Sequence, residues 1–168
     1  MKPRKKISIG VLTEIVSSHS GARAPLEIAA HLSVLGDDVT VYSYETLQDV
    51  FILRYLVKYG VRIIMISKPK LGRYFAIPDI YRRLRKNTHQ VLYFSGTPPF
   101  FIAGLLSLTP IVRMYQGTQF DAYLERFLPN QKIPIYHKFI NAILNWLIYV
   151  IEFMSFRLSS AVVAISHF

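Results

Sequence analysis

The chain alternates between short, continuous apolar runs and longer segments in which apolar residues recur at helical spacing. The short runs are rich in β-branched residues, which is typical of parallel strands that are buried on both faces. The pattern therefore predicts six strands, at Ile7–Leu12, Val39–Ser43, Val61–Ile66, Val91–Phe94, Ile111–Tyr115 and Ala161–Ile165.

Helices are predicted between these strands. Apolar residues take up helical spacing after Gly21, from Leu26 to Leu35, and Gly36 is a natural end for that helix. This alternation predicts a single α/β domain over residues 1–168, a Rossmann-like doubly wound parallel sheet with helices on both faces. The other predicted helices cover Leu47–Lys58, about Ile77–Lys86, Phe100–Leu108 and about Ile135–Leu158.

The composition describes a folded and strongly basic chain. Hydrophobic residues make up 52% and charged residues 18%, which excludes a disordered chain. The net charge of +10 favours an anionic partner: nucleic acid, phospholipid or a phosphorylated substrate. The basic residues could equally be solvated helix ends and a frayed terminus. Because the chain has no cysteine, neither a disulfide nor a thiolate metal site is possible.

Polar residues follow four of the predicted strands. In doubly wound sheets ligands bind outside the carboxyl ends of the strands, so these loops should converge on one crevice. The helix after the first loop could bind an anion with its N-terminal amides. Alternatively, the glycines only permit tight turns and the hydroxyls only cap helices. The candidate substrate-binding residues are Ser20, Gly21, Arg23, Ser95, Gly96, Gln116, Gly117, Thr118, Asp121, Ser166 and His167.

Sequence motifs for cofactors, metals and activated nucleophiles are missing. The loop before Gly21 is neither a G-x-G-x-x-G fingerprint nor a Walker A loop, so dinucleotide binding is not expected. The sequence has no H-E-x-x-H and no closely spaced pair of histidine and carboxylate ligands. It also lacks a G-x-S-x-G nucleophile elbow. We therefore expect no cofactor and no bound metal, and the sequence assigns no catalytic residue.

Three stretches, taken in order, carry a resemblance to a known family. The first is KISIGVL, followed by a loop with Gly21 and by APLEIAAHLSVLGDDVTVYSYE; the others are VLYFSGTPPFFIAGLLSLTPIVRMYQGTQFD and LSSAVVAISHF. In order and spacing they resemble the N-terminal domain of a family 4 glycosyltransferase, whose GT-B fold has two facing Rossmann-like domains. The resemblance covers essentially the whole chain.

The resemblance implies a retaining transfer of sugar from a nucleotide-sugar donor to a glycan or lipid-linked acceptor, without a protein-bound metal. In that family a C-terminal domain holds the donor, and we expect that domain to lie outside these 168 residues. Gly21 would face the donor phosphates and the acceptor, and Asp121 matches the acidic end of the family's H-G-T-D-F-D type of run. Gln116 stands where many relatives have a histidine; it can hydrogen-bond but cannot titrate. The chain should therefore supply the acceptor side and be inactive alone.

The resemblance also implies a cytoplasmic enzyme of cell-envelope polysaccharide or glycolipid biosynthesis, with peripheral association at the inner face of the membrane as an option. The run Ile7–Leu12 is too short for the apolar region of a signal peptide, so export is not expected. A non-catalytic subunit that docks a membrane, or completes a separate catalytic chain, is the alternative. Nucleic-acid binding is disfavoured, because the aromatic residues lie mostly in apolar strands and no recognition motif is present.

The predicted helix 135–158 contains the least polar stretch of the chain, residues 139–151. Burial against the sheet or another subunit is the default for such a helix. An interfacial helix is the second possibility, since Trp146 and Tyr149 suit a membrane interface. A membrane span is disfavoured, because it would place charged and amide groups in hydrocarbon. From residue 139 onward, Asn141, Asn145, Glu152, Ser155 and Ser159 fall on one narrow stripe of the helical pattern.

Overall fold

The computed structural model describes residues 5–17, 20–44, 49–67, 69, 73–95, 98–115 and 135–164. These residues contain a six-stranded sheet with the order β3-β2-β1-β4-β5-β6, in which every neighbouring pair is parallel. The strands are β1 (Ser8–Thr13), β2 (Asp38–Tyr44), β3 (Arg62–Ile66), β4 (Val91–Ser95), β5 (Ile111–Tyr115) and β6 (Ala161–Ala164).

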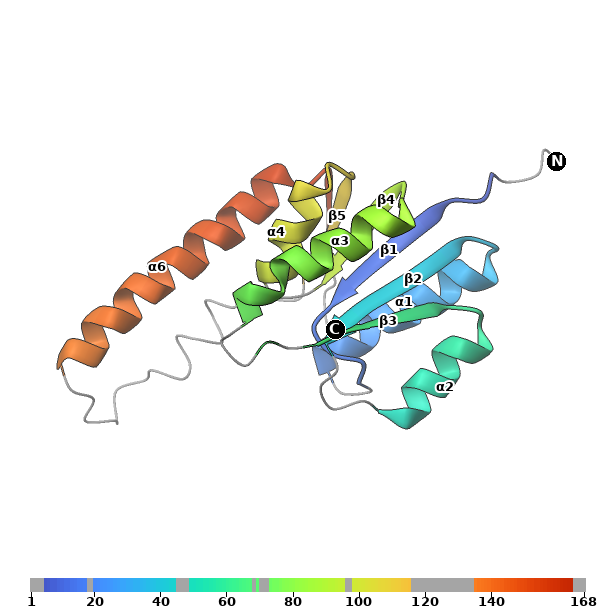
Figure 1. Cartoon of the computed structure of the whole chain (residues 1–168), viewed down its shortest axis with the longest axis horizontal. Coiled ribbons are helices and arrows are strands. Elements are labelled where there is room, and N and C mark those ends of the chain that lie inside the picture. The colour runs from blue at the N-terminus through green and yellow to red at the C-terminus, as the bar shows by residue number, and fades with distance from the viewer. Residues whose placement is uncertain are drawn as a thin grey trace.

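Helices cover both faces of this sheet (Figure 1). The first two helices pack on one face, and α3 and α4 pack on the other, with α6 beside α4 and β5. The predicted α/β, Rossmann-like doubly wound fold is therefore confirmed. The helices are α1 (Ser20–Val34), α2 (Val50–Lys58), the 3-10 helix η1 (Arg73–Ala76), α3 (Ile77–Asn87), α4 (Pro98–Leu106) and α6 (Ile135–Leu158).

The central strands are buried on both sides, because each side is covered by its own apolar cluster. Val11 of β1 points to the side of α1 and α2, while Leu12 points to the side of α3 and α4, and neither is exposed. This explains why the strands read as continuous apolar runs rather than as an alternating pattern. The edge strand β6 is different, since Val162 and Val163 both remain exposed.

Three predicted helix starts are wrong by two residues or more. Helix α2 begins at Val50, three residues after the predicted Leu47, because Asp49 caps it. The other two are the starts of α1 and α4. Helix α1 begins at Ser20, so Gly21 lies inside its first turn and not in the preceding loop. Helix α4 begins at Pro98, whereas the pattern placed Pro98 and Pro99 in a loop. The reason is the same in both cases: the first-turn N–H groups of a helix have no intrahelical acceptor, so proline or glycine is tolerated there.

Among the described residues, no helix combines the length and the hydropathy that a membrane crossing requires.

Candidate functional site at the carboxyl edge of the sheet

The order of the strands reverses between β1 and β4, and this reversal marks the place where doubly wound sheets bind ligands. The chain leaves β1 for α1 on one face of the sheet and leaves β4 for α4 on the other. The register pairs Thr13 with Ser95, so the last residues of these two strands lie side by side. Thr13 is buried and its hydroxyl donates to the carbonyl of Ile15 over 3.4 Å, while Ser95 is only half-buried.

The loop that leaves β1 is anchored at its root. The amide of Tyr44 donates to the carbonyl of Glu14 over 3.2 Å, and the amide of Asp49 donates to the carbonyl of Val16 over 3.0 Å. The side chain of Val16 is fully buried. The end of β2 and the start of α2 therefore fix the direction in which the chain approaches α1.

Two helix N-termini flank the switch point, one on each face of the sheet. Neither α1 nor α4 carries an acidic residue in its first turn. Two helices farther from the switch point do use acids: Asp49 caps α2 by accepting from the amide of Phe51 over 3.0 Å, and Asp79 lies in the first turn of α3. Because the N-terminal end of a helix carries partial positive charge, the edge between α1 and α4 favours a negatively charged ligand such as a phosphate.

Three predicted site residues lie in the first turns of α1. Ser20 and Gly21 belong to its first turn, and Pro25 has no N–H to donate to the carbonyl of Gly21 as a regular helix would. The side chain of Arg23 is exposed, and its Nε donates to Glu27 over 2.6 Å. An exposed pair at this spacing is worth only about 0.3–0.5 kcal/mol. Arg23 can therefore exchange Glu27 for an anionic ligand at little cost.

Ser95 is the fourth predicted residue that the structure describes, and it ends β4 beside Thr13. The remaining predicted residues, Gly96, Gln116, Gly117, Thr118, Asp121, Ser166 and His167, lie outside the described residues. The strands that precede them are described: β4, β5 and β6 are parallel neighbours, and Tyr115 at the end of β5 pairs with Ala164 at the end of β6. The carboxyl ends of these three strands therefore lie at the same edge of the sheet.

Arg113 is a residue of this region that the sequence analysis missed. It lies on β5 with only 7% of its surface exposed. Its guanidinium carbon is 3.9 Å from the ring centroid of Phe156 in α6 and 5.7 Å from that of Phe94 in β4. A buried cation is costly without compensating contacts, so these rings hold α6 against the sheet. The available signal was an arginine inside the otherwise apolar run IVRMY.

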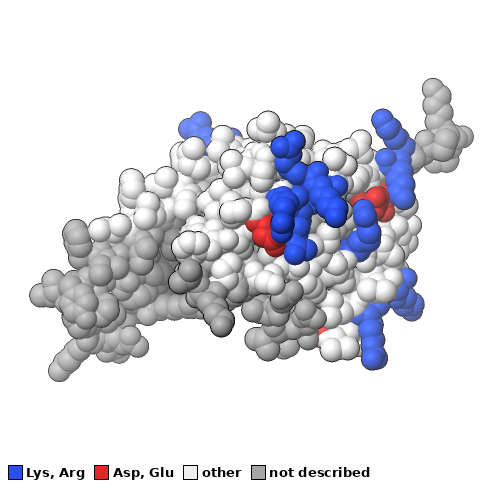
Figure 2. Space-filling view, in the orientation of Figure 1, with Lys and Arg blue, Asp and Glu red and all other residues white. Residues whose placement is uncertain are grey.

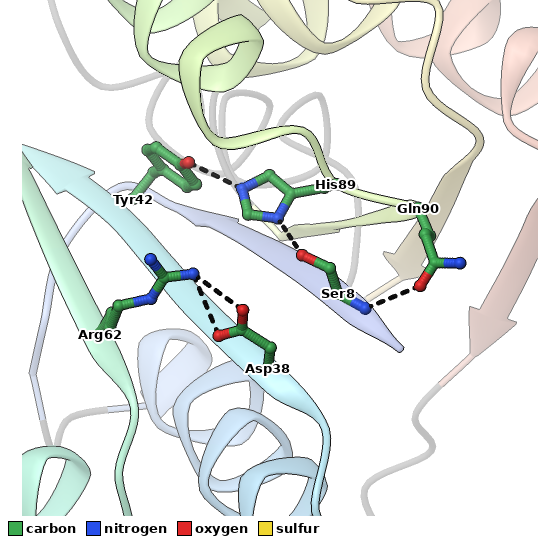
Figure 3. Close-up of polar contacts among 6 residues, drawn as sticks. All are labelled: Ser8, Asp38, Tyr42, Arg62, His89 and Gln90. Carbon is green, nitrogen blue, oxygen red and sulfur yellow. Dashed lines mark hydrogen bonds and ion pairs between the residues drawn. The ribbon is translucent and has the colours of Figure 1, made fainter. Parts of the chain in front are cut away.

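A second group of chemically versatile side chains lies at the opposite, amino edge of the sheet (Figure 3). The Nδ1 atom of His89 is 3.1 Å from the hydroxyl of Ser8, and its Nε2 atom is 2.7 Å from the hydroxyl of Tyr42. Next to them, Arg62 donates to both carboxylate oxygens of Asp38, at 3.0 and 3.1 Å. The serine and histidine resemble a nucleophile with its base.

The electrostatics of this amino-edge cluster argue for a structural role. Burial, and then the nearby Arg62 guanidinium, lower the pKa of His89 to about 4, while Asp38 acts in the opposite direction. Burial raises the pKa of Tyr42 to about 12. Both groups are therefore neutral near pH 7. Since the histidine already bonds on both ring nitrogens and lies at the amino ends of the strands, the cluster ties the sheet edge together.

A hollow of about 460 Å³ is lined by Ala24, Glu27, Ile28, His31, Leu32 and Leu35. It runs along the flank of α1 and not at the N-terminal tip of that helix, so it does not belong to the candidate site. Within the described part of the chain, no group of three or more histidines, cysteines or carboxylates could hold a metal ion.

Comparison with known proteins adds one finding. The sequence model of the family described as Glycosyltransferase Family 4 matches residues 21–168. The match includes β2 to β6 and almost all of α1. No match was found among curated proteins.

Proposed function

The chain belongs to Glycosyltransferase Family 4, and from this premise we propose that it is the acceptor-binding half of a retaining glycosyltransferase. The enzyme would move a hexose from a nucleotide-sugar donor to a glycan or lipid-linked acceptor in cell-envelope biosynthesis. A separate C-terminal domain would hold most of the donor, and this chain alone would be inactive.

The observation that carries the proposal is the pair of helix N-termini at the switch point. A nucleotide-sugar presents a diphosphate, which α1 and α4 can face with N-terminal amides and without an opposing carboxylate in their first turns. In this proposal Ser20, Gly21 and Arg23 lie near the donor phosphates, and Ser95 and Gly96 near the transferred sugar. The rest of the site would come from Gln116, Gly117, Thr118, Asp121, Ser166 and His167.

Gln116 would orient a sugar hydroxyl, because its side chain both donates and accepts hydrogen bonds but cannot carry a proton between groups. Catalysis would then depend on positioning and on stabilising the charge of the leaving phosphate, not on a general base at this position. Neither a metal nor a cofactor is needed for this role.

The first experiment is the intact mass of the native protein from its source, combined with a transfer assay. A second Rossmann-like domain adds roughly 150–200 residues, so we expect a mass about twice that of this chain. The native protein should transfer label from a pool of UDP- and GDP-sugars to an extract of its own membranes. A native mass that matches 168 residues, with no transfer from any donor, would instead favour the non-catalytic subunit.

The second experiment is Gln116→Ala in the native protein, with Gln90→Ala as a matched control. We expect the first substitution to lower kcat/KM by about tenfold to a hundredfold, because a lost hydrogen bond that leaves its partner unsatisfied costs about 1–3 kcal/mol. Gln90 lies at the amino edge, where it accepts from the amide of Ser8 over 3.0 Å, and its replacement should leave kcat/KM nearly unchanged. Unchanged turnover and unchanged acceptor affinity in Gln116→Ala would remove this segment from the mechanism.

A further inference from the structure

Helix α6 has its polarity reversed with respect to an ordinary surface helix. The sequence puts Asn141, Asn145, Glu152, Ser155 and Ser159 on one stripe, and the structure describes the side chains of the two serines. Ser155 is only 2% exposed, and Ser159 is half-buried with its hydroxyl donating to the carbonyl of Ser155. Ser155 neighbours Phe156, which stacks on Arg113 of the sheet. The described part of the polar stripe therefore faces the protein.

The opposite face of α6 is apolar and exposed. Its exposed apolar side chains, which are between 43% and 63% accessible, are Ile143, Trp146, Leu147, Tyr149, Phe153, Met154 and Leu158. Arg157 is the one charged residue on this face among the side chains that the structure describes. Surface helices normally show the reverse pattern, because exposed apolar area is unfavourable in water. A continuous apolar face of this kind indicates a partner.

A basic helix lies on the same side of the sheet. Helices α3, α4 and α6 share one layer (Figure 1), and Figure 2 shows arginine and lysine gathered over α3 within that layer. The residues in question are Arg82, Arg83, Arg85 and Lys86, against one acid, Asp79, which pairs with Arg82 and Arg83 over 2.7 and 2.9 Å. The layer therefore combines an apolar helix with a cationic one.

We propose that this layer is a docking surface for an anionic phospholipid bilayer. The apolar face of α6 would lie in the membrane interface, where tryptophan and tyrosine are favoured, and the arginines of α3 would contact lipid phosphates. A second copy of the chain is the less suitable occupant, because each copy carries +10 and pairing would bring two arginine-rich layers together. The proposal deepens the proposed function by naming the membrane as partner, and binding itself does not depend on sugar transfer.

The test uses the 168-residue chain, vesicles and the intrinsic fluorescence of Trp146, the only tryptophan of the sequence. Vesicles of phosphatidylcholine alone are compared with vesicles containing phosphatidylglycerol, at low and at high salt. We expect binding and a blue-shifted emission only with the anionic vesicles, with affinity falling at high salt. Brominated lipids should quench the emission, because Trp146 would sit at the level of the acyl chains.

Variants locate the surface. Phe153→Ser on α6 should weaken vesicle binding by about tenfold, which is the loss expected when a buried aromatic contact is removed. A separate variant that combines Arg82→Gln with Arg85→Gln should also weaken binding to anionic vesicles by about tenfold. Phe51→Ser is the matched control: Phe51 is 75% exposed on α2, on the opposite face of the sheet, and its replacement should have little effect. All three proteins change exposed positions, and their unfolding transitions would be checked first.

Several outcomes would overturn the proposal. Equal binding to neutral and anionic vesicles, or no emission shift in any vesicle, would rule out the anionic bilayer. Lipid-free self-association that Phe153→Ser abolishes would assign the face to a second copy. Sugar transfer between soluble substrates reports on the proposed function separately, so loss of vesicle binding with transfer intact, or the reverse, distinguishes the two.

Discussion

The two edges of the sheet treat polar groups in opposite ways. At the amino edge, the polar side chains bond one another: His89 joins Ser8 and Tyr42, Arg62 joins Asp38, and Asp37 accepts from the amide of Ile7 over 3.1 Å. At the carboxyl edge, two helix N-termini without first-turn acids flank the ends of β1 and β4. One edge has its polar side chains engaged with each other, and the other presents two helix N-termini.

This contrast shows why residue types alone do not identify a site. The amino edge holds a serine, a histidine, an aspartate and an arginine within a small space, which is the richer chemical inventory. Those groups satisfy each other, and they lie on the side of a doubly wound sheet that does not bind ligands. Predictions that separate stability from activity can test the contrast, and the largest effect is expected where the amino edge is most tightly packed.

Gly10→Val should destabilise the protein by about 3 kcal/mol, the upper range for overpacking a tight core. A Cβ at Gly10 would lie 2.7 Å from Cδ2 of Leu92 and 2.8 Å from Cδ2 of His89, so the amino-edge network must shift. The measurement is urea unfolding. Thr40→Val, at the residue paired with Gly10 in β2, is the control: the Thr40 hydroxyl is buried without a partner among the described residues, so this change should be neutral or stabilising. A loss below about 1 kcal/mol for Gly10→Val would mean that the edge is loosely packed.

His89→Gln should cost about 1–2 kcal/mol at pH 7.5, because two hydrogen bonds of a half-buried group are weakened. The cost should shrink on acidification. In the unfolded chain the histidine takes up a proton near pH 6.5, whereas in the folded protein it does so only near pH 4. Between these values the unfolded state binds more protons, so wild-type stability falls as the pH falls from 6.5 to 4.

The measurement for His89 is the urea midpoint of the wild type and of His89→Gln at several pH values. The glutamine variant cannot take up this proton, so its midpoint should fall less steeply over the same interval. Parallel curves for the two proteins would show that His89 does not titrate differently on folding.

The smallest effects are expected for a matched pair of serines. Ser8→Ala should lower stability by about 1 kcal/mol, since its hydroxyl bonds His89, and should leave the transfer activity of the native protein unchanged. Ser95→Ala should change stability by less than about 0.5 kcal/mol but lower kcat/KM by about tenfold. If neither substitution changes kcat/KM, Ser95 does not take part in substrate binding.

Much of the fold could be predicted from the pattern along the chain. The predicted bounds Ile111–Tyr115 and about Ile135–Leu158 match the observed elements, and the other strands agree within a residue or so at each end. This works because a strand buried on both faces must be apolar throughout, and because glycine marks the end of a helix. The predicted starts of α1 and α4 lie too late in the sequence. Proline and glycine interrupt a helix only in its interior and are tolerated in its first turn.

The candidate site was predicted less completely. The order of apolar strands was enough to predict that Ser95 and the start of α1 lie at the carboxyl edge of the sheet. In the structure both lie at that edge. The roles of Gln116, Thr118, Asp121 and His167 remain predictions. Arg113 and His89 could not be interpreted from the chain, because a single polar residue beside apolar ones does not reveal what will surround it after folding.

The sequence by itself determined the alternation of strands and helices, the basic charge, the family and the single polar stripe of α6. Helical periodicity shows which residues share a face, but it cannot show which face packs inward. Only the tertiary structure decided that Ser155 is buried while Trp146 and Phe153 are exposed. It likewise decided which polar groups of the described residues engage one another, because burial and pairing depend on neighbours that are distant in the sequence.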